Sequence, residues 1–364
     1  MNQNFNFTII MLPAGIIFAT FFFIFSLKYQ TKFILAHFLK REKSKKWGNK
    51  KKPVIGGIPM FLISFTGLLI YALNGENHLN VNYGHGSRFI LLTIAGLILA
   101  FLTGIVDDLK KQRPLAKFMM QCFCGLLIYI SLLNSISEID VILLFVYVFF
   151  VAGIINAINM IDNFDGVCGI SSTIIILGII GQLLYEHGSN SIFAYVFFLL
   201  LGVMIVFLVL NLPPARIFLG DSGTHVIGYL FAWYAGLKLW IFLKEASIIR
   251  IFEVITMTGA LFYYPLLDLV ATTTARIFHR KKFYMGGIDH TSHLFVIQLK
   301  KPWKTLLTIT LIQFIGIEIY LGIIAIQSKV MIISGFLVLT LLGAFLTILH
   351  LKNYRHLNEV FNNL

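Results

Sequence analysis

The sequence predicts an all-α integral membrane protein, a polytopic bundle of about eleven (10–11) transmembrane helices. Two observations support this fold class. Of 364 residues, 58% are hydrophobic and 12% are charged, the latter about half the charged share of an average soluble domain. Apolar runs long enough to cross a bilayer also recur along the chain. Because hydrocarbon offers backbone amides no hydrogen-bond partners, such runs must be helical. We therefore expect one integral membrane domain, residues 1–364.

The expected spans follow one another along the chain, mostly with short connections. No basic residue precedes the first run, so we expect a retained helix there rather than a cleaved signal peptide. The fourth and sixth runs are short, which makes ten helices the lower count. The spans are residues 7–26, 54–73, 88–106, 117–134, 139–158, 169–185, 191–211, 224–243, 250–272, 304–326 and 329–349.

The distribution of basic residues predicts the orientation in the membrane. With the N-terminus outside and the C-terminus in the cytoplasm, 24 of the 29 Lys and Arg residues fall in inner loops or the tail. Cytoplasmic loops carry such an excess. The net charge of +13 is mainly this topology signal, so nucleic-acid binding is not needed to explain it. The densest basic run, 40–52, is expected to be a solvated loop, with docking to anionic lipid head groups as the alternative.

Four groups of polar residues gather at the expected inner face, and the outer loops hold no comparable group. One such motif alone is more often an ordinary helix end or turn. Four on one face form a stronger pattern. The groups are Asp107 and Asp108 in GIVDDLKK, then Asn156, Asn159, Asp162 and Asp165 in NAINMIDNFDG, then Asp221 in FLGDSGTHVIG, and finally Asp289, His290 and His293 in GGIDHTSHLF.

These groups have the composition of a phosphoryl-transfer site. Carboxylates that share a membrane face repel one another unless a cation joins them or their pKa values rise. Carboxylate and amide oxygens are hard ligands that suit Mg²⁺ or Mn²⁺. Basic side chains expected on the same face, including Lys117, Arg276 and Arg280, could hold phosphates. Acidic clusters, a hard cation and nearby bases together favour phosphoryl transfer, in which positioning and charge neutralisation do most of the work.

As a set, the motifs resemble the polyprenyl-phosphate N-acetylhexosamine-1-phosphate transferases, glycosyltransferase family 4. That superfamily includes undecaprenyl-phosphate GlcNAc-1-phosphate transferases and phospho-MurNAc-pentapeptide transferases. The resemblance extends from Pro53 to His293, in family order, and its histidine motif has the DHTSH form. Three positions depart from the family pattern. Asn163 stands where many members have Gly, Thr224 replaces Ser, and Leu294 replaces the Arg usual in that subgroup.

The resemblance implies roles for individual residues. Lys117 matches the Lys that follows the paired Asp motif and contacts phosphate, and Asp221 matches the Asp that ligates Mg²⁺. Pro265 and Asp268 match a further family pattern whose role is open. The expected catalytic residues are Asp107, Asp108, Lys117, Asp162 and Asp165. The expected substrate-binding residues are Asn156, Asn159, Arg276, Arg280, Asp289, His290 and His293, and the expected metal ligands are Asp221 and Asn159.

The implied reaction transfers N-acetylhexosamine-1-phosphate from a UDP-sugar to polyprenyl (undecaprenyl) phosphate and releases UMP. It would depend on Mg²⁺ (or Mn²⁺) and would start a lipid-linked cell-envelope glycan such as O-antigen lipopolysaccharide. The implied partners are UDP-N-acetylhexosamine, polyprenyl phosphate and membrane lipids, with a homodimer as one option. The implied location is the inner (plasma) membrane, with the active site at the cytoplasmic face and residues 274–303 as a sugar-recognition loop.

Two other function classes remain open from the residues. An intramembrane Mg²⁺-dependent prenyltransferase would need two Asp-rich motifs with carboxylates at i, i+4 spacing, which DDLKK lacks. A secondary transporter could use Asp268 and Glu318 as intramembrane coupling carboxylates. Against the transporter, the polar residues crowd one face and no broken helix is expected near the middle of the membrane.

Overall fold

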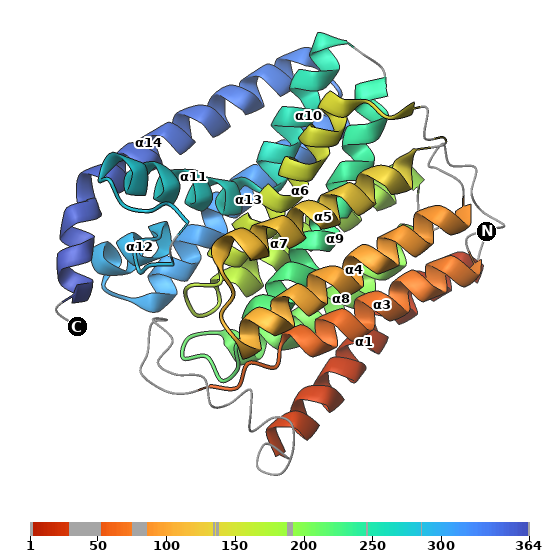
Figure 1. Cartoon of the computed structure of the whole chain (residues 1–364), viewed down its shortest axis with the longest axis horizontal. Coiled ribbons are helices and arrows are strands. Elements are labelled where there is room, and N and C mark those ends of the chain that lie inside the picture. The colour runs from red at the N-terminus through yellow and green to blue at the C-terminus, as the bar shows by residue number, and fades with distance from the viewer. Residues whose placement is uncertain are drawn as a thin grey trace.

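The computed structural model describes residues 3–28, 52–74, 86–133, 135, 138–187, 192–244, 247–284 and 286–362. These residues form thirteen α-helices and no strand (Figure 1). One isolated parallel bridge joins Val54 to Phe218. The helices are α1 (Gln3–Lys28), α3 (Gly57–Asn74), α4 (Gly86–Leu109), α5 (Pro114–Leu132), α6 (Val141–Met160), α7 (Val167–His187), α8 (Ile192–Asn211), α9 (Gly220–Lys244), α10 (Ile248–Leu261), α11 (Tyr263–Phe278), α12 (Thr291–Leu299), α13 (Pro302–Ile326) and α14 (Lys329–Asn362).

The predicted all-α, polytopic bundle is confirmed. All eleven expected spans fall on helices, including the short fourth and sixth runs, which are α5 and α7. Eight of the described helices are long and apolar enough to cross a membrane, and the bent pair α10–α11 would make nine. The apolar part of α3 is shorter, ending at Leu73. Two further helices lie outside this count: α12, which has nine residues, and α9, which carries Asp221, His225 and Lys238.

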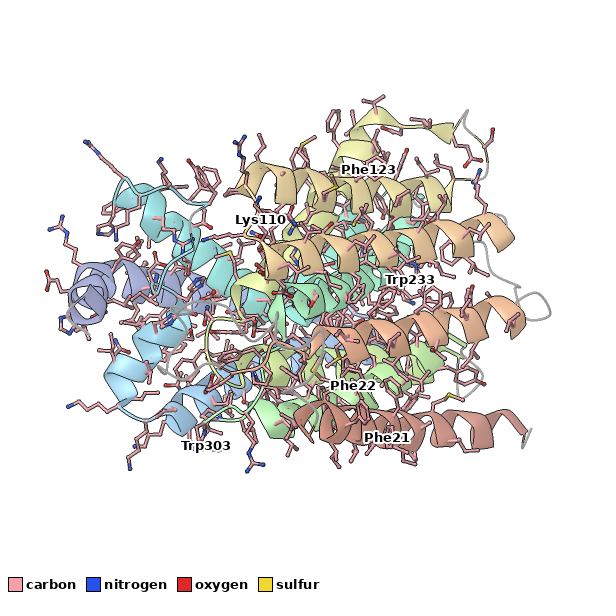
Figure 2. The ribbon with its side chains drawn as sticks, turned by 60° about the horizontal axis from the view of Figure 1, so that its bottom comes forward. Phe21, Phe22, Lys110, Phe123, Trp233 and Trp303 are labelled. Carbon is pink, nitrogen blue, oxygen red and sulfur yellow. The ribbon has the colours of Figure 1, made fainter. Side chains whose placement is uncertain are left out.

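Helix α9, with its polar residues, lies at the centre of the bundle. It packs against α3, α4, α5, α6 and α10, and most of its side chains are buried. Figure 2 shows Trp233 of α9 among the packed helices and Phe21 of α1 at the outer face; the first is fully buried and the second is 72% exposed. Because protein rather than lipid surrounds α9, it can carry polar residues that a lipid-facing helix could not.

The ninth expected span, 250–272, is not a single helix. It breaks at Phe262 into α10 and α11, which meet at 88°. Pro265 stands in the first turn of α11, where its missing N–H costs least. Gln313 of α13 bonds both sides of the break, since its Nε2 donates to Leu261 O (2.9 Å) and its Oε1 accepts from Tyr264 N (3.1 Å). The expectation of one continuous helix over 250–272 was therefore wrong, whereas the expectation about the middle of the membrane stays a prediction.

The segments that carry the four motifs meet at one end of the bundle. The last turn of α4, the loop after α6 and the first turn of α9 lie together there, with α12 beside them (Figure 1). The Val54–Phe218 bridge ties the segment before α3 to the one before α9: Phe218 N donates to Pro53 O (2.9 Å) and Gly56 N donates to Phe218 O (3.1 Å). Residues 274–303 contain the last turn of α11 and all of α12. Residues 40–51 of the basic run lie outside the described residues.

Candidate active site

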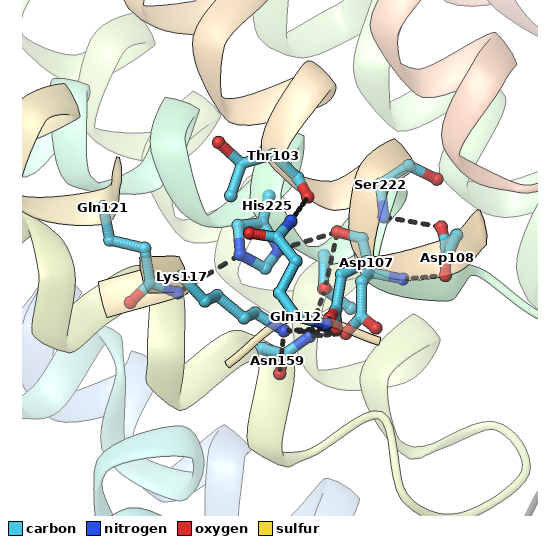
Figure 3. Close-up of polar contacts among 11 residues, drawn as sticks. Thr103, Asp107, Asp108, Gln112, Lys117, Gln121, Asn159, Ser222 and His225 are labelled. Carbon is cyan, nitrogen blue, oxygen red and sulfur yellow. Dashed lines mark hydrogen bonds and ion pairs between the residues drawn. The ribbon is translucent and has the colours of Figure 1, made fainter. Parts of the chain in front are cut away.

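Three side-chain oxygens from three separate motifs converge on the Lys117 ammonium. Its Nζ lies 3.2 Å from Asp107 Oδ2, 3.3 Å from Asn159 Oδ1 and 3.1 Å from Asp221 Oδ1 (Figure 3). These residues come from α4, α5, α6 and α9, so the four helix ends share one charged centre. We call Asp107, Lys117, Asn159 and Asp221 the carboxylate cluster. The sequence predicted that these residues would meet, and the structure brings them together.

Asp108 binds backbone N–H groups at the start of α9. Its Oδ1 accepts from Asp221 N and its Oδ2 from Ser222 N, both at 2.9 Å, so it caps the N-terminus of α9 from another helix. A close approach of α4 to α9 makes this possible, since a Cβ on Gly104 would lie only 2.3 Å from the Cα of Ser222. Gly220 precedes the cap with φ +78°, a conformation that favours glycine. Direct participation of Asp108 in catalysis stays a prediction.

A second set of polar contacts lies behind the cluster. Asn159 Nδ2 donates to Asp221 Oδ1 and, at 2.8 Å, to Thr224 Oγ1. His225 Nδ1 lies 2.7 Å from Asp221 O, and its Nε2 lies 3.2 Å from Gln121 Nε2 (Figure 3). Sequence reasoning did not identify Gln121 or His225. Their positions four residues after Lys117 and Asp221, one helical turn further along the same faces, were the available signal.

The remaining residues of NAINMIDNFDG are not all in the cluster. Asp165 Oδ2 accepts from Lys52 Nζ (3.1 Å) and Ala215 N (2.9 Å), so this carboxylate holds two loops together. Asp162 is half-buried in the turn after α6. Asn156 lies about one turn before Asn159 on α6, and its Nδ2 contacts Met160 Sδ at 3.7 Å. Catalytic roles for Asp162 and Asp165, and substrate contact by Asn156, stay predictions.

Asp268 anchors the histidine motif. Its carboxylate is fully buried on α11. It accepts from His290 Nδ1 (2.8 Å), Thr291 N (2.8 Å) and Thr291 Oγ1 (2.6 Å). The bond to Thr291 N satisfies a backbone donor in the first turn of α12. Because Nδ1 of His290 faces Asp268, the ring nitrogen left for another group is Nε2.

Arg276 and Asp289 form a second anchor. Nε and Nη2 of Arg276 donate to Oδ2 and Oδ1 of Asp289 at 2.9 and 2.6 Å, and Nη1 donates to Phe283 O. Tyr354 of α14 also donates to Asp289 Oδ2, at 2.7 Å. Burial alone would raise the pKa of Asp289, but Arg276 and Tyr354 hold it well below its usual range. Arg276 and Asp289 therefore hold the segment between α11 and α12 in place. Arg280, in contrast, lies exposed just after the end of α11. Substrate contact by these three stays a prediction.

The histidine motif packs on the loop after α6. Ser292 Oγ donates to Asn163 Oδ1 (2.7 Å), and Phe164 meets the His293 ring edge-on with centroids 6.5 Å apart. Asn163, a departure from the family pattern, thus joins two motifs. Burial lowers the pKa of His293 to about 3, and the neighbouring His290 adds to that effect. We call residues 286–299 the histidine loop.

The oxygens around Lys117 suit a hard cation. Nowhere in the described ranges are three or more His, Cys, Asp or Glu side chains grouped to hold a metal ion. The carboxylate cluster instead offers two carboxylates and one amide, all converging on a single cationic atom. Such all-oxygen sets are what Mg²⁺ or Mn²⁺ prefers. The residues present therefore fit the expected cation.

Comparisons with known proteins agree with this site. The family model described as "Glycosyl transferase family 4" matches residues 90–237, which include the carboxylate cluster. A phospho-N-acetylmuramoyl-pentapeptide-transferase of Streptococcus agalactiae serotype Ia is 24% identical over 263 residues, 65% of this chain and 76% of that protein. The same enzyme name in Prochlorococcus marinus (strain MIT 9301) goes with 29% identity over 264 residues, 65% of this chain and 69% of that protein.

A longer match comes from Bacillus subtilis (strain 168). Its "Probable undecaprenyl-phosphate N-acetylglucosaminyl 1-phosphate transferase" is 24% identical over 314 residues, 82% of this chain and 80% of that protein. The structure is a multi-pass helical bundle, and the family match falls on the helices that hold the three converging oxygens. Residues 90–237 thus match the model of glycosyl transferase family 4, and the names of these relatives agree with that match.

Proposed function

We propose that this protein transfers N-acetylhexosamine-1-phosphate from a UDP-sugar to polyprenyl phosphate and releases UMP. The observation that carries the proposal is the convergence of Asp107, Asn159 and Asp221 on the Lys117 ammonium at one end of the bundle. The names of the relatives support the kind of acceptor and the transferred group. A membrane-embedded site suits a lipid acceptor, because its phosphate can stay at the interface while its chain remains in the bilayer.

In the proposed reaction, an oxygen of the lipid phosphate attacks the β-phosphorus of the UDP-sugar. A new P–O bond forms, and the bond from the β-phosphorus to the bridging oxygen breaks. UMP leaves with that electron pair. The second pKa of a phosphate monoester is near 6, so the nucleophile is largely ionised at neutral pH. A strong general base is therefore unnecessary, and the protein contributes mainly position and charge.

Within this reaction, Lys117 is assigned to hold a phosphate as a point charge. Asp221 and Asn159, with Asp107 beside them, would hold Mg²⁺ or Mn²⁺. When bound, the ion would neutralise the pyrophosphate and the departing UMP. Asp107 is assigned to orient the reacting groups, or to remove a last proton. Asp108 keeps Asp221 and Ser222 in place through the α9 cap.

The histidine loop is assigned to the donor. Asp268 holds His290 through Nδ1, so the proposal gives Nε2 to a sugar or phosphate oxygen. His293 lies behind it, buried against Phe164. The Arg276–Asp289 pair steadies the loop. The nature of the N-acetylhexosamine is left to experiment, with UDP-GlcNAc as the first donor to try.

The proposed location is the inner (plasma) membrane, with the carboxylate cluster at the cytoplasmic face. The asymmetry of Lys and Arg residues supports this orientation. The product would be the first lipid-linked intermediate of a cell-envelope glycan.

The transporter alternative is less well supported. Its two candidate carboxylates have different surroundings. Asp268 is buried and bonded to His290 and Thr291, whereas Glu318 is exposed beside an apolar pocket between α13 and α14. The prenyltransferase alternative lacks a second Asp-rich motif with i, i+4 spacing.

A defined reconstitution would test the proposal. Purified protein is incubated with undecaprenyl phosphate, Mg²⁺ and each of several labelled UDP-sugars, and UMP and lipid-linked sugar are measured. The expected result is equal amounts of both products with one N-acetylhexosamine donor. Release of pyrophosphate from a prenyl diphosphate would favour the prenyltransferase instead. Sugar uptake into vesicles without UMP release would favour the transporter.

A further inference from the structure

A basic pocket of about 460 Å³ lies between the last residues of α11 and the last turns of α14. Three cationic side chains line it, Arg280, Lys281 and Arg355, against one carboxylate, Glu359. Among the described residues, neither Arg280 nor Arg355 makes a side-chain ion pair with a carboxylate. The pocket thus has a surplus of positive charge that would complement an anionic group.

Arg280 occupies this pocket at some conformational cost. Its φ is +54°, in the left-handed region that glycine usually fills after a helix. The chain turns there because Lys281 N donates to Arg276 O (2.7 Å) and Arg280 N donates to Ile277 O (3.0 Å). A residue with a Cβ is disfavoured in this conformation, so the backbone gives no reason for arginine at this position. The positive charge that Arg280 brings to the pocket is a reason for arginine there.

The pocket lies beside the end of a candidate membrane span. The candidate span of α14 ends at Leu357, between Arg355 and Glu359. Phe278 lines the pocket and is 74% exposed, and Phe283 and Tyr284, which closely follow Lys281 in the sequence, are about half exposed. In a membrane protein, aromatic side chains of this kind lie at the interface between hydrocarbon and water. A basic pocket with this rim matches the head group of a phospholipid better than a soluble anion.

The floor of the pocket contacts the anchor of the histidine loop. Tyr354 packs against the His279 ring, with centroids 4.6 Å apart, and Lys281 Nζ lies 5.1 Å from the centre of the Tyr354 ring. The Tyr354 hydroxyl donates to the same Asp289 oxygen that accepts from Arg276 Nε. A ligand that holds Lys281 and His279 in place therefore also steadies Asp289.

We propose that this pocket binds the phosphate of an anionic membrane phospholipid, and that binding steadies the histidine loop through Tyr354. The bound lipid is a structural partner, distinct from the polyprenyl phosphate of the proposed reaction. The binding part stands on the pocket alone. The assignment of the steadied loop to the sugar donor rests on the proposed function.

The binding part is tested in lipid nanodiscs. Wild type, R355Q and K304Q are reconstituted in phosphatidylcholine with or without phosphatidylglycerol, and the phospholipid retained after extraction is measured by native mass spectrometry. Lys304 is an exposed cation outside the pocket, so K304Q changes the charge equally. We expect R355Q to retain about fivefold less phosphatidylglycerol than wild type, and K304Q to behave like wild type. If R355Q retained as much phosphatidylglycerol as K304Q and wild type, the proposal would be overturned. The pocket cations would then serve only as a topology signal.

Two further measurements test whether the bound anion is a lipid or a soluble molecule, and whether its binding steadies the histidine loop. Inorganic phosphate or UMP that displaces phosphatidylglycerol at equal concentration would show a soluble-anion site and overturn the lipid assignment. Hydrogen exchange of residues 286–299 should slow with phosphatidylglycerol in wild type and K304Q but not in R355Q. Lipid retention without that slowing would refute the link through Tyr354. These readouts need no turnover, so they hold or fail independently of the transferase assay.

Discussion

Gln121 and His225 face each other one helical turn beyond Lys117 and Asp221, so two successive polar contacts join α5 to α9. The first is the Lys117–Asp221 ion pair at 3.1 Å and the second is the Gln121–His225 contact at 3.2 Å. Because His225 Nδ1 faces the Asp221 carbonyl, it carries the proton, and Nε2 accepts from the Gln121 amide. The second contact is buried. It can keep the two helices aligned when Lys117 turns to a substrate phosphate.

The first prediction concerns this second contact. Q121L should remove the donor to a buried acceptor and destabilise the protein by about 1–3 kcal/mol. H225F should have a similar effect. The double variant Q121L/H225F should be less destabilised than the sum of the singles by roughly 0.5–3 kcal/mol, since it leaves no polar group unpaired. Thermal unfolding in one detergent would measure all four proteins, and strictly additive changes would show that the two residues do not interact.

The second prediction separates the paired aspartates. In D108N, one of the two backbone N–H groups at the start of α9 loses its acceptor, so stability should fall by about 1–2 kcal/mol. In D107N, a charge facing Lys117 is lost, so kcat should fall roughly ten- to 150-fold with little change in stability. Unfolding midpoints and steady-state kinetics on both variants decide this. The reverse pattern would mean that Asp108 faces the reaction and Asp107 supports the fold.

Much of the fold was predictable because lipid leaves the chain few options. Long apolar runs must be helical, and all eleven predicted runs are. The break at Phe262 was missed because the run 250–272 is long enough to cross a membrane as one helix, and the compensating groups come from Gln313, about fifty residues later. Pro265 was the local signal for it. The polar residues of α9 were also local signals, since they predict a helix surrounded by protein.

The site was predictable where charges had to be neutralised and less so where side chains support one another. Asp221 and Asn159 were expected to hold a metal ion close to Asp107, and the structure brings all three residues to Lys117. Pairs such as Arg276 with Asp289, or Asn163 with Ser292, depend on how the histidine loop folds back on α11 and the α6–α7 loop. No spacing in the sequence reveals such contacts. This is why Arg276 was predicted to bind phosphate, whereas the structure pairs it with a buried carboxylate.

The third prediction tests the expected metal. D221N should lower turnover at least about a hundredfold, because Lys117 and Asn159 both bind this carboxylate and a hard cation would lose a charged ligand. E318Q makes the same charge change on an exposed side chain far from the motifs in sequence and should keep activity. Activity should also fall in EDTA and return with Mg²⁺. Full activity in EDTA would rule out the metal assignment while leaving the role of Asp221 as the partner of Lys117.

The fourth prediction tests the anchor of the histidine loop. R276K keeps the charge but loses the two parallel bonds to Asp289 and the bond to Phe283 O, so local opening of residues 286–299 should become easier by about 1.5–3 kcal/mol. R280K, on an exposed side chain nearby, is the matched control and should not change opening. Hydrogen exchange of the loop measures both. Unchanged exchange in R276K would show that Tyr354 and Asp268 suffice to hold the loop.

The last prediction concerns pH and the same loop. Burial lowers the pKa of His293 to about 3 in the closed loop, whereas an exposed histidine titrates near 6.5. Between these values the open loop binds a proton that the closed loop does not, so closure weakens as the pH falls. The Asp289 carboxylate acts at lower pH, because Arg276 depresses its pKa. Its contribution to loop stability is fully present above about pH 4, near the usual pKa of an aspartate, and is lost as the pH falls through the depressed value.

From about pH 6.5 to about pH 5, the His293 effect alone should reduce the free energy of loop closure by about 1.6 kcal/mol. H293F keeps a ring against Phe164 and cannot be protonated, and H293Q keeps polarity without a titratable group. Both variants should therefore lose this pH dependence, even if each changes closure at neutral pH. Hydrogen exchange of residues 286–299, compared between variant and wild type at each pH, cancels the intrinsic pH dependence of exchange. If wild type and both variants open in parallel as the pH falls, another group controls the loop and His293 is charged or accessible in the closed state.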